Sequence, residues 1–266
     1  MINKSYQFNY LYSGENTNPP LLFLHGFLGN EADWEAIISE LRTDFYCLAL
    51  DLPGHGKTRF LKDQSYYSLE RCAQGIMELI NQLELQKCNL IGYSMGGRLA
   101  LYLAVHYPDM WNKIILESAS PGLKSVSEQE ERWRHDLNLA IKLEKEDLNN
   151  FLHSWYKQPI FNSLRRYPEF QALFDKRLNN NKFELAHALR GMSVGKQLPL
   201  WNNLKDIELP ILLVTGELDY KFNLIMHEMS DLLPKSGLRL VHGCGHTVHF
   251  ENPKMFIDIV KEFLLY

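Results

Sequence analysis

The fold is decided by one run, which reads Cys88-Asn89-Leu90-Ile91-Gly92-Tyr93-Ser94-Met95-Gly96-Gly97-Arg98-Leu99-Ala100-Leu101. It contains the pattern G-x-S-x-G, in which Gly92 and Gly96 flank Ser94. An apolar strand pattern precedes the serine and an apolar helical pattern follows it, which is the context that this motif requires. In a sharp strand-to-helix turn, glycines leave room where a Cβ would clash. The run therefore predicts a nucleophilic serine raised above a sheet, at the N-terminus of a helix.

Outside this run, short apolar segments alternate with helical patterns, which indicates βαβ units and a mostly parallel sheet. The expected buried strands are Leu21–Leu24, Tyr46–Leu50, Asn89–Ile91, Lys113–Leu116, Ile211–Thr215 and Arg239–Val241. The expected helices are Trp34–Leu41, Leu69–Leu83, Met95–His106, Leu224–Leu232 and Lys254–Leu264. The chain of 266 residues is long enough for one large α/β domain with a sizeable core.

The pattern changes between residues 128 and 200, where Glu, Lys, Arg, Asn and aromatic residues are frequent and the periodicity is helical. Leu137–Leu148 and Phe183–Gly191 fit amphipathic helices. We expect residues 128–200 to form a helical cap between a first core part, 1–127, and a second, 201–266. Ligands of open α/β sheets bind outside the carboxyl ends of the strands. We therefore favour a cap that covers this region, and the alternative is a helical segment that projects into solvent and has no function.

The serine motif predicts an acid and then a histidine farther along the chain. The run Leu212-Leu213-Val214-Thr215-Gly216-Glu217-Leu218-Asp219 reads as a buried strand that ends in an acidic turn. We expect Asp219 to be the acid because it lies deeper in the loop after the strand. Glu217 is the alternative.

The histidine is expected in Gly243-Cys244-Gly245-His246, a loop that follows another apolar strand. Its glycines give His246 the freedom to reach back to Ser94. His242, at the end of the strand pattern, and His249, at the start of the next helical region, are alternatives. A serine, an acid and a histidine in this order predict an α/β-hydrolase fold, with a mostly parallel sheet flanked by helices and a helical cap insertion.

A second loop is expected to complete the site. The first strand runs into Leu24-His25-Gly26-Phe27-Leu28-Gly29, and in this fold that loop supplies one backbone N–H of an oxyanion hole. We assign the hole to the N–H groups of Phe27 and Met95. The run Asp51-Leu52-Pro53-Gly54-His55-Gly56 is interpreted as a structural turn.

Composition excludes several classes of function. The net charge of −4 and pI near 6.2 give no general attraction to nucleic acid or anionic membranes. The N-terminus lacks the apolar run of a signal peptide, and no stretch approaches the roughly 20 apolar residues of a membrane span. None of the four cysteines is in a C-x-x-C pair. We expect a cytoplasmic protein with reduced thiols and no obligate protein partner.

The sequence contains no complete motif for a cofactor or a metal ion. Gly56-Lys57-Thr58 ends like a phosphate-binding P-loop, but Asp51 stands where that motif needs glycine. No G-x-G-x-x-G follows a strand. The histidines around Cys244 are separated by glycines that argue against a shared metal site. We therefore expect neither a metal nor an organic cofactor.

Arg98 lies four residues after Ser94 in a helix with an apolar sequence. Positions i and i+4 share one helical face, so the guanidinium can point along the floor of the same pocket. A charge there is costly unless it meets an anion or a carboxylate. A ligand contact and a structural salt bridge remain open as alternatives. The cap adds further candidates: Arg132, Arg134, Trp155, Tyr156 and Arg177.

The sequence resembles the 2-succinyl-6-hydroxy-2,4-cyclohexadiene-1-carboxylate (SHCHC) synthases of menaquinone and phylloquinone biosynthesis over nearly its whole length. Three core runs carry the likeness: His25-Gly26-Phe27-Leu28-Gly29, Asp51-Leu52-Pro53-Gly54-His55-Gly56 and Gly92-Tyr93-Ser94-Met95-Gly96-Gly97-Arg98. Cap and C-terminal segments are more specific to that family: Glu131-Arg132-Trp133-Arg134-His135-Asp136, the segments 155–161 and 177–181, and the segments 216–222 and 245–253.

The resemblance implies a lyase. Such an enzyme removes pyruvate from 2-succinyl-5-enolpyruvyl-6-hydroxy-3-cyclohexene-1-carboxylate, a tricarboxylate, by a 2,5-elimination that needs no cofactor. It implies that the carboxylates are bound by Arg98, Arg132 and Arg177, and that the pocket is lined by Tyr93, Trp155 and Lys221. A C–C or ester hydrolase with the same triad is the first alternative. A non-catalytic ligand receptor on this fold is the second.

Overall fold

The structure is a computed structural model that describes residues 6–60 and 64–266. Its centre is a seven-stranded sheet with the order β2-β4-β3-β6-β7-β8-β9. All neighbouring strands are parallel except β2 and β4. The strands are β2 (Tyr10–Ser13), β3 (Pro20–Leu24), β4 (Tyr46–Leu50), β6 (Cys88–Tyr93), β7 (Trp111–Glu117), β8 (Ile211–Gly216) and β9 (Ser236–Val241). The expected α/β class with a mostly parallel sheet is confirmed.

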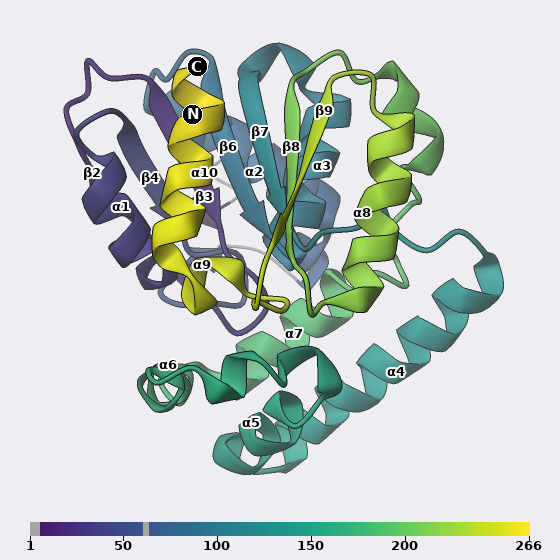
Figure 1. The fold of residues 1–266 in the computed structure, drawn as a ribbon. Helices are drawn as coiled ribbons and strands as arrows, with labels where there is room; N and C mark the ends of the chain where they lie inside the picture. Colours follow the sequence, from purple (N-terminus) through teal and green to yellow (C-terminus); the bar gives the residue numbers. More distant parts are fainter. Residues whose placement is uncertain (1–5, 61–63) are drawn as a thin grey trace.

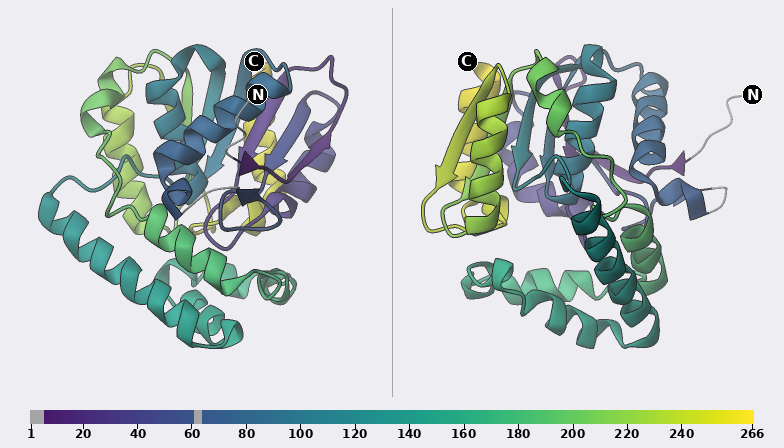
Figure 2. Two further views of the ribbon diagram at one scale, coloured as in Figure 1. Left: turned by 180° about the vertical axis from the view of Figure 1, so that it is seen from behind. Right: turned by 90° about the vertical axis from the view of Figure 1, so that its right-hand side faces the viewer.

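Helices cover both faces of this sheet (Figures 1 and 2). One hydrophobic core joins the sheet to α2 (Leu69–Gln82), α3 (Met95–His106) and α8 (Tyr220–Leu232). The other joins it to α1 (Glu35–Leu41), α9 (Val248–Glu251) and α10 (Pro253–Leu265). Within β3, Leu22 and Leu24 face the first core, whereas Leu21 and Phe23 face the second. Both faces of the strand are therefore buried, as continuous apolar strands of parallel sheets require.

A separate group of helices lies beneath the carboxyl ends of the strands (Figures 1 and 2). It comprises α4 (Val126–Lys145), α5 (Leu148–Tyr156), α6 (Phe170–Arg177) and α7 (Lys182–Gly191), all between β7 and β8 in the chain. These helices have a hydrophobic cluster of their own, to which the core loop contributes the fully buried Leu28. The helices α4–α7 are called the cap below.

Short elements connect the main ones. The two-stranded sheet pairs β1 (Tyr6–Gln7) with β5 (Arg59–Phe60). The 3₁₀ helices are η1 (Glu31–Trp34), η2 (Gln64–Tyr67), η3 (Pro108–Met110), η4 (Pro159–Phe161), η5 (Leu164–Arg166) and η6 (Trp201–Asp206). Of the helices in the described ranges, none is long and apolar enough to cross a bilayer. All four cysteines are free and buried.

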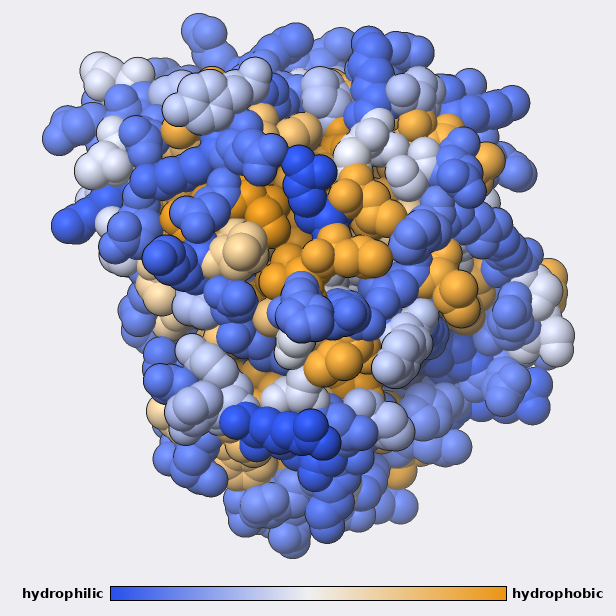
Figure 3. Space-filling view, in the orientation of Figure 1, coloured by the Kyte–Doolittle hydropathy of each residue, from blue (hydrophilic) through white to orange (hydrophobic). Residues whose placement is uncertain are grey.

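Several predicted boundaries are wrong. The expected helix Leu137–Leu148 lies mostly in the second half of α4, which starts early at the capping box of Ser125 and Glu128 and ends at Lys145, before Asp147 caps α5. Strand β2 was not predicted, because its four residues are only partly buried and give no apolar run. Strand β9 begins at Ser236, ahead of the expected Arg239, and most of it is not buried, since it forms the sheet edge. Hydrophobic side chains show on the surface over this edge (Figure 3).

Candidate active site

Ser94 occupies a strained turn between β6 and α3. Its backbone has φ 49° and ψ −104°, a conformation that residues other than glycine rarely adopt. Both flanking glycines are required sterically: a Cβ on Gly92 would lie 2.5 Å from the Gly96 carbonyl oxygen, and one on Gly96 would lie 2.2 Å from the Leu24 carbonyl oxygen. The Ser94 N–H donates to the Glu117 carbonyl at 2.8 Å, which anchors the turn to β7. The serine is thus held at the carboxyl end of the sheet, as expected.

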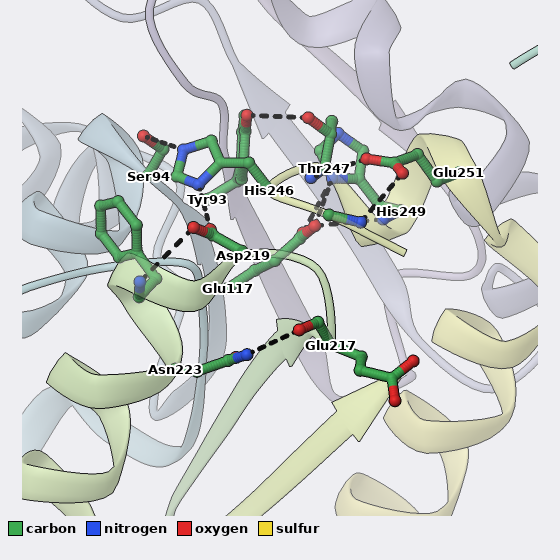
Figure 4. A network of polar contacts seen from close by, with 12 residues as sticks. Tyr93, Ser94, Glu117, Glu217, Asp219, Asn223, His246, Thr247, His249 and Glu251 are labelled. Atoms are coloured by element: carbon green, nitrogen blue, oxygen red, sulfur yellow. Dashed lines mark hydrogen bonds and ion pairs between the residues drawn. The ribbon is translucent and has the colours of Figure 1, made fainter. Parts of the chain in front are cut away.

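His246 connects Ser94 to Asp219 (Figure 4). The Nδ1 of His246 lies 2.6 Å from Asp219 Oδ2, and its Nε2 lies 3.1 Å from Ser94 Oγ. Because a carboxylate only accepts hydrogen bonds, Nδ1 carries the proton and the Nε2 lone pair faces the serine hydroxyl. His246 and Asp219 are both buried. This arrangement can accept the Ser94 proton and stabilise the imidazolium that results.

The alternative acid and histidines lie elsewhere. Glu217 pairs with the exposed His242 at 2.6 Å and accepts the Gly243 N–H at 3.2 Å. In Figure 4 the Glu217 carboxylate points away from Ser94. His249 is buried beside Glu117, with Nδ1 2.8 Å from Oε2. The structure therefore brings Asp219 and His246 to Ser94 and keeps Glu217, His242 and His249 apart from it.

Two carboxylates that sequence reasoning missed hold the His246 loop in place. Glu251 accepts the backbone N–H groups of Gly245 at 2.9 Å and Thr247 at 3.3 Å, on either side of the histidine. Glu117 accepts the backbone N–H and the imidazole N–H of His249. An acid at the end of the apolar β7 run was the only sequence signal for Glu117. The turn residue Asp51 has a similar structural role, because it accepts the N–H groups of Glu31 and Lys57.

The loop after β3 faces Ser94 as expected. Phe27 and Met95 both line the pocket beside the serine. Within the described ranges, neither backbone N–H donates to another protein group. His25 fixes this loop: its Nε2 accepts the Leu52 N–H at 2.9 Å, so its Nδ1–H donates to the Gly26 carbonyl at 2.7 Å. Burial lowers the pKa of His25, which keeps the ring in this neutral form.

The pocket above Ser94 has a volume of about 530 Å³ and lies between the core and the cap. All six expected substrate-binding residues line it: Tyr93, Arg98, Arg132, Trp155, Arg177 and Lys221. The Tyr93 hydroxyl is 3.2 Å from Thr247 Oγ1, and the Trp155 ring lies 5.0 Å from the Phe27 ring. Aromatic walls with a few convergent charges are typical of a small-molecule site.

The cations of the pocket differ in their partners. Arg98 donates to two neutral acceptors, Gln197 Oε1 at 2.8 Å and the Met192 carbonyl at 2.7 Å. No acidic residue in the described ranges forms an ion pair with it, so the salt-bridge alternative is wrong. Burial lowers the pKa of the Arg98 guanidinium, and nearby Arg132 lowers it further. Arg98 thus has no direct ion-pair partner below the cap, and only the more distant Asp136, which pairs with Arg132, offsets part of its charge.

The remaining cations are placed differently. Arg132 contacts Asp136 at 2.8 Å, so its charge is partly offset. Lys221 lies at the exposed rim, and partial desolvation of its ammonium group, followed by the charge of Arg132, lowers the pKa of that group. Arg177 is buried, and both of its terminal nitrogens donate to Asp33. Across the described ranges, no cluster of three or more His, Cys, Asp or Glu residues could hold a metal ion.

Comparisons with known proteins agree with this geometry. A family model described as alpha/beta hydrolase fold matches residues 19–253, so fold and site define an α/β hydrolase. The SHCHC synthase of Serratia proteamaculans (strain 568) is 33% identical over 256 residues, covering 96% of each chain. A protein of Bacillus subtilis (strain 168) provisionally given the same name is 40% identical over 253 residues, covering 94% of this chain and 92% of its own. The chain belongs to the SHCHC synthase family.

Solved structures extend the likeness. MenH from S. aureus matches with a TM-score of 0.91 at 33% identity, covering 98% of both chains. An esterase from Thermogutta terrifontis matches with a TM-score of 0.85 at 23% identity, which shows a shared fold only. The fold alone does not identify the reaction, which has to be argued from the site.

Proposed function

We propose that the protein is a carbon–oxygen lyase that eliminates pyruvate from 2-succinyl-5-enolpyruvyl-6-hydroxy-3-cyclohexene-1-carboxylate to give SHCHC, a step of menaquinone or phylloquinone biosynthesis. One observation carries the proposal: the Ser94–His246 pair opens into the same pocket as Arg98, a guanidinium with no acidic partner. A buried guanidinium without a direct ion-pair partner is costly unless a ligand carboxylate neutralises it. A tricarboxylate meets that need, whereas a simple neutral ester does not.

Ser94 acts as the base in this proposal. His246, oriented by Asp219, accepts the hydroxyl proton while Ser94 Oγ removes the proton on the ring carbon beside the succinyl carbonyl. The electron pair moves onto the carbonyl oxygen, where the N–H groups of Phe27 and Met95 hold the enolate. Collapse of the enolate shifts the ring double bond and breaks the C–O bond to the enolpyruvyl group. The departing enolate takes a proton and becomes pyruvate, so no water is consumed and no acyl-enzyme is required.

Arg98 and Arg132 bind carboxylates of the substrate, and bidentate arginine–carboxylate pairs fix its orientation. Lys221 contributes positive charge at the rim, while Tyr93 and Trp155 line the walls. Arg177, the third expected ligand, also lines the pocket, and its pair with Asp33 uses two of the five N–H groups of the guanidinium, so it can still meet a carboxylate.

The cap residues 128–200 close the site, and the substrate is the partner that the proposal requires. A cytoplasmic location belongs to the same proposal and is supported by the four free, buried cysteines, since disulfides are rare in that compartment.

The test is a direct assay of the purified protein with the cyclohexene substrate. We expect equal amounts of SHCHC and pyruvate, and loss of nearly all turnover in Ser94→Ala. Fast cleavage of simple esters without any SHCHC would establish the hydrolase alternative instead. Ligand binding by Ser94→Ala without any turnover by the wild type would favour the receptor alternative.

A further inference from the structure

We infer that Gln197 is a positioning residue that determines specificity, because its neutral amide orients Arg98 and leaves the guanidinium charge available for a substrate carboxylate. The inference rests on the proposed function and deepens it. Gln197 lies in the loop between α7 and η6 and is buried. Its Oε1 accepts a hydrogen bond from Arg98 Nη1 at 2.8 Å, and the Met192 carbonyl accepts one from Nη2 at 2.7 Å. These contacts fix the guanidinium and use only two of its five N–H groups.

The other half of the Gln197 amide contributes nothing to the fold. A guanidinium only donates hydrogen bonds, so Oε1 is the atom that faces Arg98, and the orientation of the amide follows. Its Nε2 packs near Gly122, where a Cβ would lie 3.5 Å from it. Within the described ranges, this buried nitrogen has no hydrogen-bond partner. Glutamate has nearly the same shape, so it would lose no hydrogen bond here and would form a charge-assisted pair with Arg98.

Stability of the fold alone therefore favours an acid at position 197. A buried donor without a partner is unfavourable, and so is a buried cation without a direct ion-pair partner. The amide leaves both in place, whereas a carboxylate would remove both. Proteins depart from such rules at functional sites. Here the departure keeps the charge of Arg98 available, because a carboxylate at position 197 would take the place of the substrate carboxylate.

The acidic residues that line the pocket show the same separation from Arg98. They are Asp33, Asp136 and Asp219. Each is paired with a different side chain, namely Arg177, Arg132 and His246, respectively. Asp136 is also held by the Ser193 hydroxyl at 2.6 Å, which fixes its second oxygen away from Arg98. The identity of residue 197 thus determines whether Arg98 meets a substrate with its charge available or already neutralised.

The kinetic test compares Gln197→Glu with Gln197→Met on the cyclohexene tricarboxylate. We expect Gln197→Glu to raise KM roughly ten- to hundredfold, since the introduced carboxylate competes for a charge-assisted contact. Its kcat should change less than about threefold, because the lost contact is equal in the ground and transition states. Gln197→Met is neutral and of similar length, and Arg98 keeps its contact with the Met192 carbonyl. This variant should raise KM only about threefold.

The matched control is Gln129→Glu. It introduces the same charge in α4, where the Gln129 amide donates to the Leu123 carbonyl at 3.1 Å. Its KM should stay within about twofold of wild type. Circular dichroism and thermal melting verify that every compared variant is folded.

A double variant separates positioning from direct binding. If Gln197 acts through Arg98, Gln197→Met should add no further loss to Arg98→Met. An additional loss would identify the amide as a substrate ligand and overturn the inference. Equal KM values for Gln197→Glu and Gln197→Met would overturn it too, because the charge of residue 197 would then be irrelevant. The pair of methionine variants remains decisive if Gln197→Glu does not fold.

A second measurement does not depend on activity. Citrate, a small tricarboxylate, is titrated into the protein, and the melting temperature is compared with that in sodium chloride of equal ionic strength. Citrate should raise the melting temperature of wild type and Gln129→Glu, but not that of Gln197→Glu. An equal rise in Gln197→Glu, or no rise in wild type, overturns the inference. A wild type that responds to citrate but forms no SHCHC refutes the proposed function alone, and the response of Gln197→Glu still tests the role of Gln197.

Discussion

At the scale of single residues, the chemistry depends on two side chains one helical turn apart. Ser94 supplies the hydroxyl at the strained start of α3, and Arg98 supplies a charge from the next turn. The helix places both in one pocket, so the same local sequence fixes the reacting group and the group that recognises an anion. The neutral partners of Arg98 orient its guanidinium without cancelling its charge.

Replacing Arg98 by methionine should weaken recognition of the tricarboxylate selectively. Arg98→Met keeps a long side chain but removes a charge-assisted contact of about 1.5–3 kcal/mol, so kcat/KM should fall roughly ten- to hundredfold. Steady-state kinetics measures this loss. The control is Arg134→Met, because Arg134 is an exposed cap residue that pairs with Glu130. An equal loss in both variants would remove the proposed role of Arg98.

At the scale of elements, the sequence predicted those strands and turns whose structure is determined by their own residues. The buried strands β3, β4 and β8 have continuous apolar runs, and the glycines around Ser94 mark a turn that other residues cannot form. The pair of Arg177 with Asp33 left no such trace, because the two residues are 144 positions apart and an arginine in a cap helix looks like any other. Contacts of this kind are set by how the cap packs on the core.

The steric requirement at the Ser94 turn predicts the effect of Gly96→Ala. The added Cβ would meet the backbone carbonyl oxygens of Leu24 at 2.2 Å and His25 at 2.6 Å, which cannot move without displacing β3. We expect a loss of about 1–3 kcal/mol in the free energy of unfolding, measured with urea, together with most of the activity.

Gly237→Ala, in β9, is the matched control. Its Cβ would meet only the tip of the Leu212 side chain at 3.2 Å, which can rotate. Equal destabilisation by the two substitutions would contradict the steric account of the turn.

At the scale of the whole molecule, function depends on the core and the cap, which together line one pocket. The core supplies the reacting groups, while the cap supplies aromatic walls, Arg132 and the hydrophobic cluster that buries Leu28 of the loop after β3. The core also buries neutral histidines beneath that loop. His25 and His55 lie 5.0 Å apart, ring to ring, and both are almost fully buried.

These histidines predict how stability depends on pH. Burial lowers the pKa of His55 to about 3 from its ordinary 6.5, so below pH 6.5 the unfolded chain takes up a proton that the folded protein does not. His55 therefore contributes stability above pH 6.5 that is lost as the pH falls. Between about pH 7 and pH 5 this loss amounts to about 2 kcal/mol.

Urea unfolding of wild type and His55→Gln at both pH values measures the difference. Other groups titrate in the same range in both proteins, so the comparison isolates His55. Between pH 7 and pH 5, the free energy of unfolding of the variant should fall by about 2 kcal/mol less than that of the wild type. The same loss in both would show that His55 is protonated in the folded state.

Elimination and hydrolysis are distinguished by the mass of the product that the wild-type protein forms from 2-succinyl-5-enolpyruvyl-6-hydroxy-3-cyclohexene-1-carboxylate in ¹⁸O-labelled water. Elimination by the Ser94 base predicts SHCHC that has not gained the elements of water, apart from exchange of its ketone oxygen, formed in step with pyruvate and absent with Ser94→Ala. A ring product that has gained the elements of labelled water would contradict elimination, because Ser94 and His246 would then be activating water for hydrolysis.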